Sequence, residues 1–512
     1  MRTVVVNGEA LTVEDVVDVA NGAARAELGP EVAARMEFSL GVVTAAIAGD
    51  SPVYGVNTGF GALADTAVGE ADLNRLQRSI VVSHAAGSGA PLGDAAVRAI
   101  LLLRARTLAA GLSGVRVDLP RRLLELLELN LLPVIPGKGS VGASGDLAQL
   151  AHLAQPLIGG GRLRTPADGP AGRPAAEVLA EHGIEPLTLG PKEGLSLVNG
   201  TEPMQALLAF SVSDTELLVA AADIACAMSI EALLGTDRPY DERVQVIRPH
   251  PGQLDSAANL RALLAGSGLM ASHRHSRHAV QDAYCLRCAP QVHGAVRDVL
   301  GYARRVLDTE LGAVVDNPVI VADGEVMTTG NFHGEPLAFA ADMLGMAISE
   351  LASISERRVD RMLDPAFSRG LPPFLAPDAG TNSGYMLAQY TAASLVSENK
   401  VLAHPSSVDT IPTSGKQEDH VSMGWTGVRK LRDIVENVRT CLSVEILCAA
   451  QGVGMRADIA EPSAAIAAVH SLIRQHVPRM DVDREVAEQI AAIDRLLPDI
   501  CETASANCGG LR

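Results

Sequence analysis

Apolar and polar residues follow two different patterns along this chain of 512 residues. After Asn199, apolar residues recur every three to four positions over stretches much longer than a strand, which predicts long helices. These stretches are 204–234, 295–311, 337–363, 383–403 and 428–452. Before Asn199 the segments are short and are interrupted by Gly and Pro. We therefore expect a mainly α fold, with a smaller mixed N-terminal region (1–200) and a bundle of long helices (201–512) integrated into one unit.

The N-terminal region also carries local signals. Residues 3–6 have the composition of a short strand, and Thr12 and Asp15 have the spacing of a capping box ahead of an amphipathic helix. The segment 159–174, GGGRLRTPADGPAGRP, is rich in Gly and Pro. This composition predicts a surface loop.

Aromatic residues are scarce, at 3% of the chain, whereas hydrophobic residues make up 47%. Aliphatic side chains must therefore build the core. Each Tyr or Phe in a polar, Gly-rich setting then becomes a candidate for a functional role.

The charge balance excludes some classes of partner. The formal net charge is −18, from 42 Lys and Arg against 60 Asp and Glu. Nucleic acids and anionic membranes bind to basic faces, so we expect neither as a partner. The long uncharged stretch 379–397 contains polar residues throughout, and we expect no membrane span.

Cysteine usage points to a reducing compartment. The chain has seven scattered Cys, and its first residues lack the apolar core of a signal peptide. These features favour a cytoplasmic location.

The most unusual segment is 137–154, GKGSVGASGDLAQLAHLA. One interpretation is a Gly-rich turn followed by a helix for which Asp146 is the N-cap. A phosphate loop would need a Lys and a Ser or Thr at its end, and a dinucleotide site would need a preceding apolar strand. Neither context is present in this segment.

A second interpretation is that Ala143, Ser144 and Gly145 cyclise. Gly145 has no Cβ, so its nitrogen can approach the Ala143 carbonyl closely, and Ser144 carries a hydroxyl that can leave as water. Loss of two waters would give a methylidene-imidazolone ring, an electrophile that no ordinary side chain supplies. The N–H groups at the following helix start would favour the negative charge that develops when a nucleophile adds.

The segment GSVGASGDLAQLAHLA resembles the signature of the aromatic amino-acid ammonia-lyases, and the resemblance extends over nearly the whole chain. Further matching motifs, in order, are YGVNTGFG (54–61), SHAAG (83–87), LVNGT (197–201), VQDAYCLRC (280–288), DNP (316–318), GNFHG (330–334) and QEDHVSM (417–423). The resemblance implies a ring formed autocatalytically from Ala143-Ser144-Gly145, with no metal or nucleotide required. It also implies a homotetramer whose active sites combine residues from several subunits.

The resemblance implies elimination of ammonia from an aromatic amino acid. Ser83-His84 and the block that contains Glu418 favour L-histidine as the substrate and trans-urocanate as the product. The alternatives are an aminomutase, a tyrosine or phenylalanine ammonia-lyase and, in a different class, a non-catalytic helical assembly protein.

The resemblance also assigns catalytic roles. Tyr54 becomes the candidate base, although a phenol titrates near pH 10 and would need a positive environment. Arg287 would hold the substrate carboxylate, a task that suits a bidentate guanidinium, or would form a surface salt bridge. Gln281, Tyr284 and Arg287 recur every three residues and, in a helix, would line one wall of a pocket.

Substrate recognition is expected from His84 and Glu418, since imidazole has one donor and one acceptor nitrogen. Without the resemblance they read as a core His and a solvated Glu. Asn199 would contact the ring or the substrate amine, or cap a helix. Phe332 and Asp146 would shape the ring or help it to form, or act in packing and N-capping.

The histidines of His273-x-His275-x-x-His278, with Cys285 and Cys288 nearby, could be read as zinc ligands. Their spacing fits no common structural zinc site, and a solvated basic loop is the simpler interpretation.

The chain departs from the family pattern at Gln149, Cys285 and Lys416, where Pro, Ser and Asn are usual. None of the three removes a catalytic group. We expect Lys416 to influence substrate affinity or pH dependence because it adds a cation near Glu418.

Overall fold

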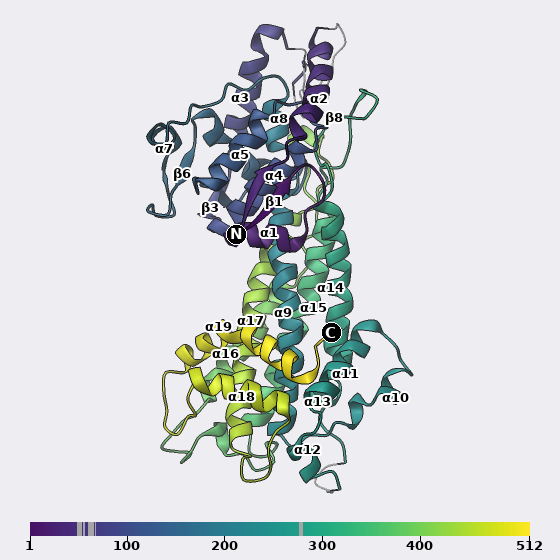
Figure 1. The fold of residues 1–512 in the computed structure, drawn as a ribbon, viewed down its shortest axis with the longest axis vertical. Coiled ribbons are helices and arrows are strands. Elements are labelled where there is room, and N and C mark those ends of the chain that lie inside the picture. The colour runs from purple at the N-terminus through teal and green to yellow at the C-terminus, as the bar shows by residue number, and fades with distance from the viewer. Residues whose placement is uncertain (49–53, 55–56, 60–65, 67, 276–279) are drawn as a thin grey trace. The chain divides into compact units, whose positions relative to one another are not determined.

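The structure is a computed structural model, and it describes residues 1–48, 54, 57–59, 66, 68–275 and 280–512. Long helices dominate it (Figure 1). The predicted mainly α fold, a bundle of long helices with a smaller mixed N-terminal region, is confirmed.

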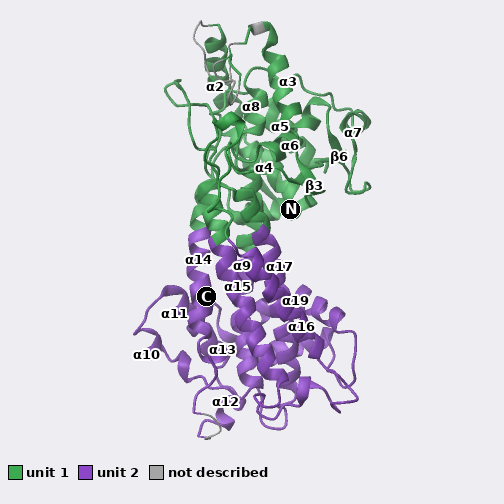
Figure 2. Cartoon of the chain, turned by 180° about the vertical axis from the view of Figure 1, so that it is seen from behind, with its two compact units in different colours: residues 1–213, 304–342, 405–429 green, residues 214–303, 343–404, 430–512 purple. Residues whose placement is uncertain are grey.

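The chain forms two compact units, coloured separately in Figure 2. The first comprises residues 1–213, 304–342 and 405–429, and the second comprises 214–303, 343–404 and 430–512. Four of the five boundaries between the units fall inside long helices, and the fifth lies between residues 404 and 405. The four helices are α9 (Glu202–Ala232), α14 (Ala289–Glu310), α15 (Glu335–Leu363) and α17 (Gly424–Gly454). This division differs from the expected one after residue 200, because these helices each contribute residues to both units.

The first unit contains most of the short elements. Its helices are α1 (Val13–Ala20), α2 (Val32–Ile47), α3 (Leu73–His84), α4 (Asp94–Ala109), α5 (Asp118–Glu128), α6 (Leu147–Ala154), α7 (Ala175–Glu181) and α8 (Glu193–Val198). Its strands are β1 (Arg2–Val6), β2 (Ala24–Leu28), β3 (Ser88–Pro91), β4 (Leu132–Pro133), β5 (Pro136–Lys138), β6 (Arg162–Arg164), β7 (Arg173–Pro174), β8 (Val319–Ile320) and β9 (Val326–Met327).

These strands form small sheets. β1 and β2 pair in parallel from Arg2 opposite Ala24 to Val6 opposite Leu28, and α4 packs against α1 and α5 beside them. The other sheets are antiparallel and have the orders β3-β5, β4-β6-β7 and β8-β9. The second unit is helical, with α10 (Glu242–Gln245), α11 (Pro251–Leu263), α12 (Gly268–Ser272), α13 (Tyr284–Arg287), α16 (Met386–Leu402), α18 (Ala464–His476) and α19 (Val486–Cys508).

The local predictions have mixed outcomes. Thr12 and Asp15 form the expected capping box at the start of α1. The predicted loop 159–174 is wrong in part, because β6 and β7 pair within it and Leu163 is buried. Pairing satisfies the backbone polar groups that burial removes from water.

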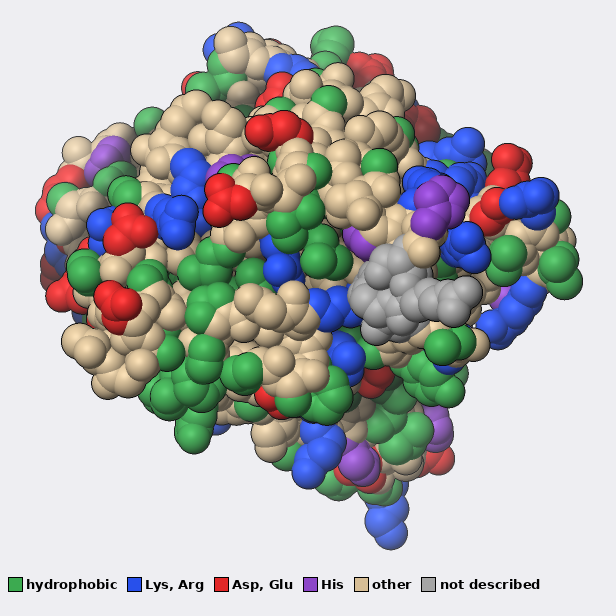
Figure 3. Space-filling model, turned by 90° about the horizontal axis from the view of Figure 1, so that it is seen from below, with side chains coloured by type: hydrophobic (Ala, Val, Ile, Leu, Met, Phe, Trp, Pro, Cys, Tyr) green, Lys and Arg blue, Asp and Glu red, His purple; other side chains and the backbone are tan. Residues whose placement is uncertain are grey.

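Among the residues that the structure describes, one helix, α15, is long and apolar enough to cross a membrane by length and composition. Of its most apolar window, 61% is buried inside the protein, which is typical of a core helix. Acidic and basic side chains are interspersed on the face drawn in Figure 3.

Candidate active site

A cavity of about 450 Å³ in the first unit brings together several of the predicted site residues. Among its lining residues are Tyr54, His84, Ser144, Asn199 and Glu418. They come from five separate segments of the chain, including the end of α3 and the residue that follows α8. The remaining lining residues are Gly59, Leu76, Ser79, Ile80, Ser83, Leu147, Leu195, Asn317 and Ser414.

The loop before α6 has a backbone conformation that demands small residues. Gly142, Ser144 and Gly145 have φ values of 71°, 50° and 68°. A Cβ on Gly145 would lie 1.8 Å from the carbonyl oxygen of Gly200, so no other residue fits there. Ser144 is held in a left-handed conformation that costs energy for a residue with a side chain.

The carbonyl oxygen of Ser144 accepts two hydrogen bonds. The backbone N–H of Gly200 donates to it over 3.2 Å. In the orientation of the Asn199 amide that satisfies its neighbours, the amide nitrogen also donates to this carbonyl over 3.1 Å, and its oxygen accepts from the backbone N–H of Asn317. These two donors favour negative charge on the Ser144 oxygen.

Asp146 precedes α6, but its side chain does not cap this helix. Its carboxyl instead accepts from the Ser140 hydroxyl over 2.6 Å and from the Met204 backbone N–H over 3.0 Å. Burial raises the pKa of Asp146 to about 7, although both hydrogen bonds act to lower it. Asp146 therefore occupies the expected N-cap position of α6, but its side chain makes no hydrogen bond to the backbone of that helix.

Hydrogen bonds from two distant segments of the chain, 423–425 and Gly334, hold the loop before Ser144. The carbonyl of Val141 accepts from the Met423 backbone N–H over 2.8 Å, and the carbonyl of Gly137 accepts from the Trp425 indole over 3.0 Å. The Gly142 carbonyl accepts from the backbone N–H of Gly334 over 3.2 Å. Phe332 lies two residues before Gly334 and is partly buried. Ala143, the first of the three residues predicted to form the ring, is buried.

Glu418 faces Ser144 across the cavity. Its Oε1 lies 3.5 Å from the Ser144 hydroxyl, and its Oε2 accepts from the Thr413 hydroxyl over 2.9 Å. Thr413 was not found by the sequence reasoning, because it lies outside the QEDHVSM motif. A Thr a few residues before a loop carboxylate gives no local signal of this contact.

His84 is the last residue of α3 and is partly buried in the cavity wall. Burial lowers the pKa of His84, while the Ile80 carbonyl and the charge of Glu418 act in the opposite direction. The Ser83 hydroxyl lies 3.0 Å from its Nδ1. The net shift favours a neutral imidazole, which can both donate and accept a hydrogen bond.

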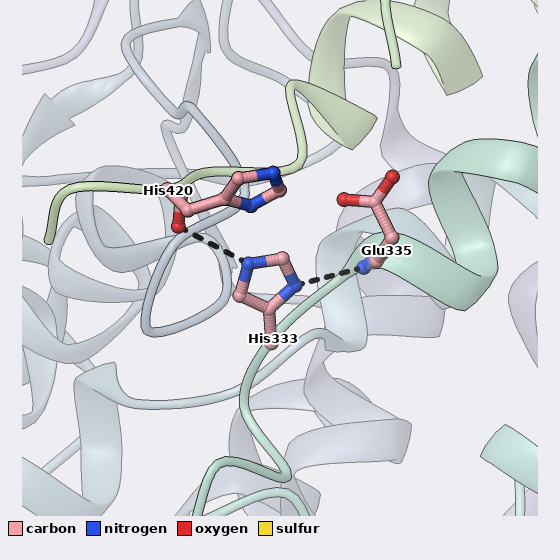
Figure 4. A group of neighbouring side chains, drawn as sticks. All are labelled: His333, Glu335 and His420. Atoms are coloured by element: carbon pink, nitrogen blue, oxygen red, sulfur yellow. Dashed lines mark hydrogen bonds between the residues drawn. The ribbon is translucent and has the colours of Figure 1, made fainter. Parts of the chain in front are cut away.

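A group with metal-ligating side chains, His333, Glu335 and His420, lies in the same unit (Figure 4). Each offers one ligand atom, and these atoms lie within 4.8 Å of one another. Figure 4 shows that both ring nitrogens of His333 are engaged: Nδ1 accepts from the Glu335 backbone N–H, and Nε2 donates to the His420 carbonyl over 3.2 Å. We interpret the group as a link between the GNFHG and QEDHVSM segments.

Three predicted residues are in the second unit: Gln281, Tyr284 and Arg287. The expectation that all three lie in one helix is wrong, because α13 begins at Tyr284 and has only four residues. Tyr284 is 71% exposed, and the Arg287 guanidinium carbon lies 4.7 Å from the centre of its ring. Two carbonyls of α13 are fixed: that of Leu286 accepts from the Tyr240 hydroxyl over 2.8 Å, and that of Cys285 accepts from Arg358 over 3.2 Å.

The segment considered for zinc lies partly outside the described residues, since His278 falls in the gap 276–279. His273 has a backbone partner, because its Nε2 lies 2.6 Å from the Gly235 carbonyl oxygen.

The unusual Gln149 is buried in α6, and its amide donates to the Pro136 carbonyl over 3.3 Å. The helix begins at Leu147, two residues before Gln149.

Comparisons with known proteins agree with the motifs. Residues 11–475 match the family described as aromatic amino acid lyase. The chain is 52% identical over 505 residues to a histidine ammonia-lyase of Anaeromyxobacter dehalogenans, covering 98% of this chain and 99% of that protein. It resembles the crystal structure of histidine ammonia-lyase from Trypanosoma cruzi, with a TM-score of 0.90, 39% identity, and coverage of 99% and 96%. It also resembles tyrosine aminomutase from Streptomyces globisporus, with a TM-score of 0.92, 37% identity, and coverage of 100% of both chains.

Proposed function

Since the chain belongs to the aromatic amino acid lyase family, we propose that it is an ammonia-lyase that converts L-histidine to trans-urocanate and ammonia. The observation that carries this proposal is the 52% identity to a histidine ammonia-lyase over 98% of the chain. The cavity that gathers Ser144, His84 and Glu418 supports it independently.

The prosthetic group of the proposed reaction is a methylidene-imidazolone ring made from Ala143, Ser144 and Gly145. These residues fit the ring, because the Gly145 position excludes a Cβ and the Ser144 carbonyl already has two donors. The ring supplies an electrophilic carbon that turns the substrate amine into a better leaving group. Asn199 and the Gly200 N–H would polarise its carbonyl, and Asp146 would support its formation.

Recognition of the imidazole falls to His84 and Glu418. The lowered pKa of His84 keeps it neutral, so that it can hydrogen-bond to either nitrogen of the substrate ring. The Glu418 carboxylate, steadied by Thr413, would accept from the substrate N–H. Phenylalanine and tyrosine have no ring N–H to donate, and this favours histidine over them.

Tyr54, in the cavity wall, is the proposed base that removes the β-proton. Arg287 would bind the substrate carboxylate, with Gln281, Tyr284 and Phe332 as further walls of the site. The exposed Tyr284, in the second unit, fits a homotetramer in which neighbouring subunits complete each site.

The cysteines and the net charge support the proposed compartment and partners. All seven cysteines are free thiols, which supports a reducing cytoplasmic location. The acidic net charge of −18 speaks against nucleic-acid or membrane partners. We expect no metal requirement.

The second candidate is an aminomutase, because the tyrosine aminomutase structure aligns with the chain at a TM-score of 0.92. The products separate the two reactions. Incubation with L-histidine should release stoichiometric ammonia and urocanate, whose ultraviolet absorbance can be followed directly. Accumulation of a β-amino acid would favour the aminomutase, and a protein inert toward every aromatic amino acid would favour a non-catalytic assembly.

The Ser144→Ala variant removes the hydroxyl that must leave during ring formation. It should fold normally and lose turnover. Full activity in this variant would refute the proposed electrophile.

A further inference from the structure

We propose that the buried ion pair Arg104–Glu202 positions the backbone of residues 199–201 against Gly145 and so promotes closure of the ring. This inference rests on the proposed function, because it concerns how that prosthetic group forms. It makes Arg104 and Glu202 positioning residues, since neither is among the lining residues of the cavity.

The pair is fully enclosed. Arg104 lies in α4, Glu202 is the first residue of α9, and both side chains are 0% exposed. The Nη1 of Arg104 donates to Glu202 Oε1 over 2.8 Å and to the Asn199 carbonyl over 2.9 Å. Burying two charges carries a large desolvation cost, which the attraction between them need not recover in full. A specific structural task would explain why such a pair is kept here.

The ion pair packs against Gly200, which lies between the two residues that Arg104 contacts, Asn199 and Glu202. A Cβ on Gly200 would lie 2.3 Å from Arg104 Nη1 and 2.2 Å from Glu202 Oε2, so the pair packs directly against this backbone. On its other side, Gly200 donates to the Ser144 carbonyl over 3.2 Å and accepts from the Asp146 N–H over 2.8 Å. These two bonds bracket Gly145, whose own Cβ position overlaps the Gly200 carbonyl.

Ring closure needs this kind of support because an amide nitrogen is a poor nucleophile. The nitrogen of Gly145 must bond to the carbonyl carbon of Ala143, whose oxygen leaves as water with the N–H protons of Ser144 and Gly145. A C=N bond to the Ser144 nitrogen results. The Ser144 hydroxyl leaves with the Cα hydrogen as a second water and gives the C=C bond, so no oxidant or reductant is required.

Geometry is therefore the main means by which the protein can accelerate the first bond. Holding two reacting groups in the right geometry lowers the barrier to a reaction of this type, because the entropy of bringing them together has already been paid. The Gly200 backbone limits how far Gly145 can move away from Ala143. The ion pair in turn limits how far Gly200 can yield.

The test measures ring closure directly and does not depend on turnover. The full chain is synthesised in a cell-free system, and samples are quenched at intervals. Intact-protein mass spectrometry then separates the open form from the closed form, whose mass is lower by two waters. In Arg104→Met/Glu202→Met, which removes both charges and leaves neither unpaired, we expect closure to slow by about tenfold or more. Arg104→Lys, with a shorter stem, should show a smaller delay.

Arg358→Met/Glu445→Met is the matched control, because that pair is also 0% exposed but belongs to the second unit. It should close at the wild-type rate. Folding of each variant is checked by circular dichroism and thermal unfolding. Wild-type closure rates in the folded Arg104 variants would overturn the inference, and so would an equal delay in the control.

If the double variant does not fold, Arg104→Lys decides by the same criteria. A wild-type chain that never loses two waters would overturn the proposed prosthetic group, and this inference with it. Normal closure in both wild type and variants would overturn only the positioning role.

Discussion

Thr413 and Glu418 form a tight pair beside Ser144. The Thr413 hydroxyl donates to Glu418 Oε2 over 2.9 Å, and the two residues also pair as an antiparallel backbone bridge. The other carboxylate oxygen, Oε1, lies 3.5 Å from the Ser144 hydroxyl. Thr413 therefore fixes the carboxylate orientation on which the proposed recognition of imidazole depends.

Replacing Thr413 with Val removes this hydrogen bond and preserves the side-chain shape. We expect kcat/KM for L-histidine to fall about 10- to 150-fold, because a hydrogen bond to a charged group contributes about 1.5–3 kcal/mol. Steady-state kinetics with urocanate detection measure the change. Thr440→Val is the control, since its hydroxyl donates to the Glu436 carbonyl within α17. Equal kcat/KM in wild type and Thr413→Val would show that Thr413 does not orient Glu418.

Tyr54→Phe removes only the hydroxyl of the proposed base. We expect turnover to fall by about 10²–10⁴-fold, the range typical of a lost general base. The melting temperature should stay close to that of wild type, because Tyr54 is partly exposed in the cavity wall. Tyr390→Phe, at a tyrosine that is 66% exposed, should leave both quantities unchanged. A fall of twofold or less in Tyr54→Phe would assign the base to another residue.

Asp146 predicts a pH dependence of stability. Burial raises its pKa from an ordinary value of 3.8 to about 7, so between these values the folded chain binds a proton that the unfolded chain has lost. The contribution of Asp146 to stability is therefore fully present below about pH 4 and is lost as the pH rises toward 7. Each unit of the shift corresponds to about 1.4 kcal/mol.

Asp146→Asn keeps an acceptor for the Met204 N–H and a donor for the Ser140 oxygen, but it cannot titrate. Denaturant unfolding at several pH values should give a flatter profile between pH 4 and 7 than wild type. Some slope should remain, because burial also raises the pKa of Glu310 and of Glu231 to about 7. A profile identical to that of wild type would contradict the assignment to Asp146.

Lys416 combines an unusual charge with an unusual conformation, since its φ is 74°. Asn tolerates this left-handed region better than Lys does, so Lys416→Asn should stabilise the chain by a few tenths of a kcal/mol, roughly. It should also shift the pH profile of kcat/KM by removing a cation near Glu418. Lys416→Gln separates the two effects, because it removes the charge without the conformational preference. An unchanged pH profile in both variants would exclude an electrostatic role for Lys416.

The sequence predicted what depends on local patterns. The helices expected at 204–234 and 337–363 are observed as α9 and α15, with bounds within two residues, because unbroken periodicity over so many turns has few other solutions. The hairpin of β6 and β7 was missed because its Gly- and Pro-rich composition reads as a loop. The Arg104–Glu202 pair joins residues 98 positions apart, and no local pattern encodes such a contact.

The shared-site proposal makes the last prediction. Ser144 is in the first unit and Arg287 is in the second, so a site that combines subunits can draw the two residues from different chains. Ser144→Ala and Arg287→Met should each be nearly inactive alone. When the two variants are co-expressed with different tags and hybrid tetramers are isolated, about a quarter of randomly assembled sites should have both residues intact.

Recovered activity in the hybrids, measured per site, therefore tests the assembly directly. A site built from one chain would contain one defect in every copy, and its hybrids would stay as inactive as the parents. The control is a mixture of the two variants purified separately, whose subunits have not exchanged and whose activity should remain at the level of the parents. Both residues are intact only in sites that cross a subunit boundary, so activity in the hybrids cannot come from either variant alone. Stable hybrids without activity would show that each site is built from a single chain.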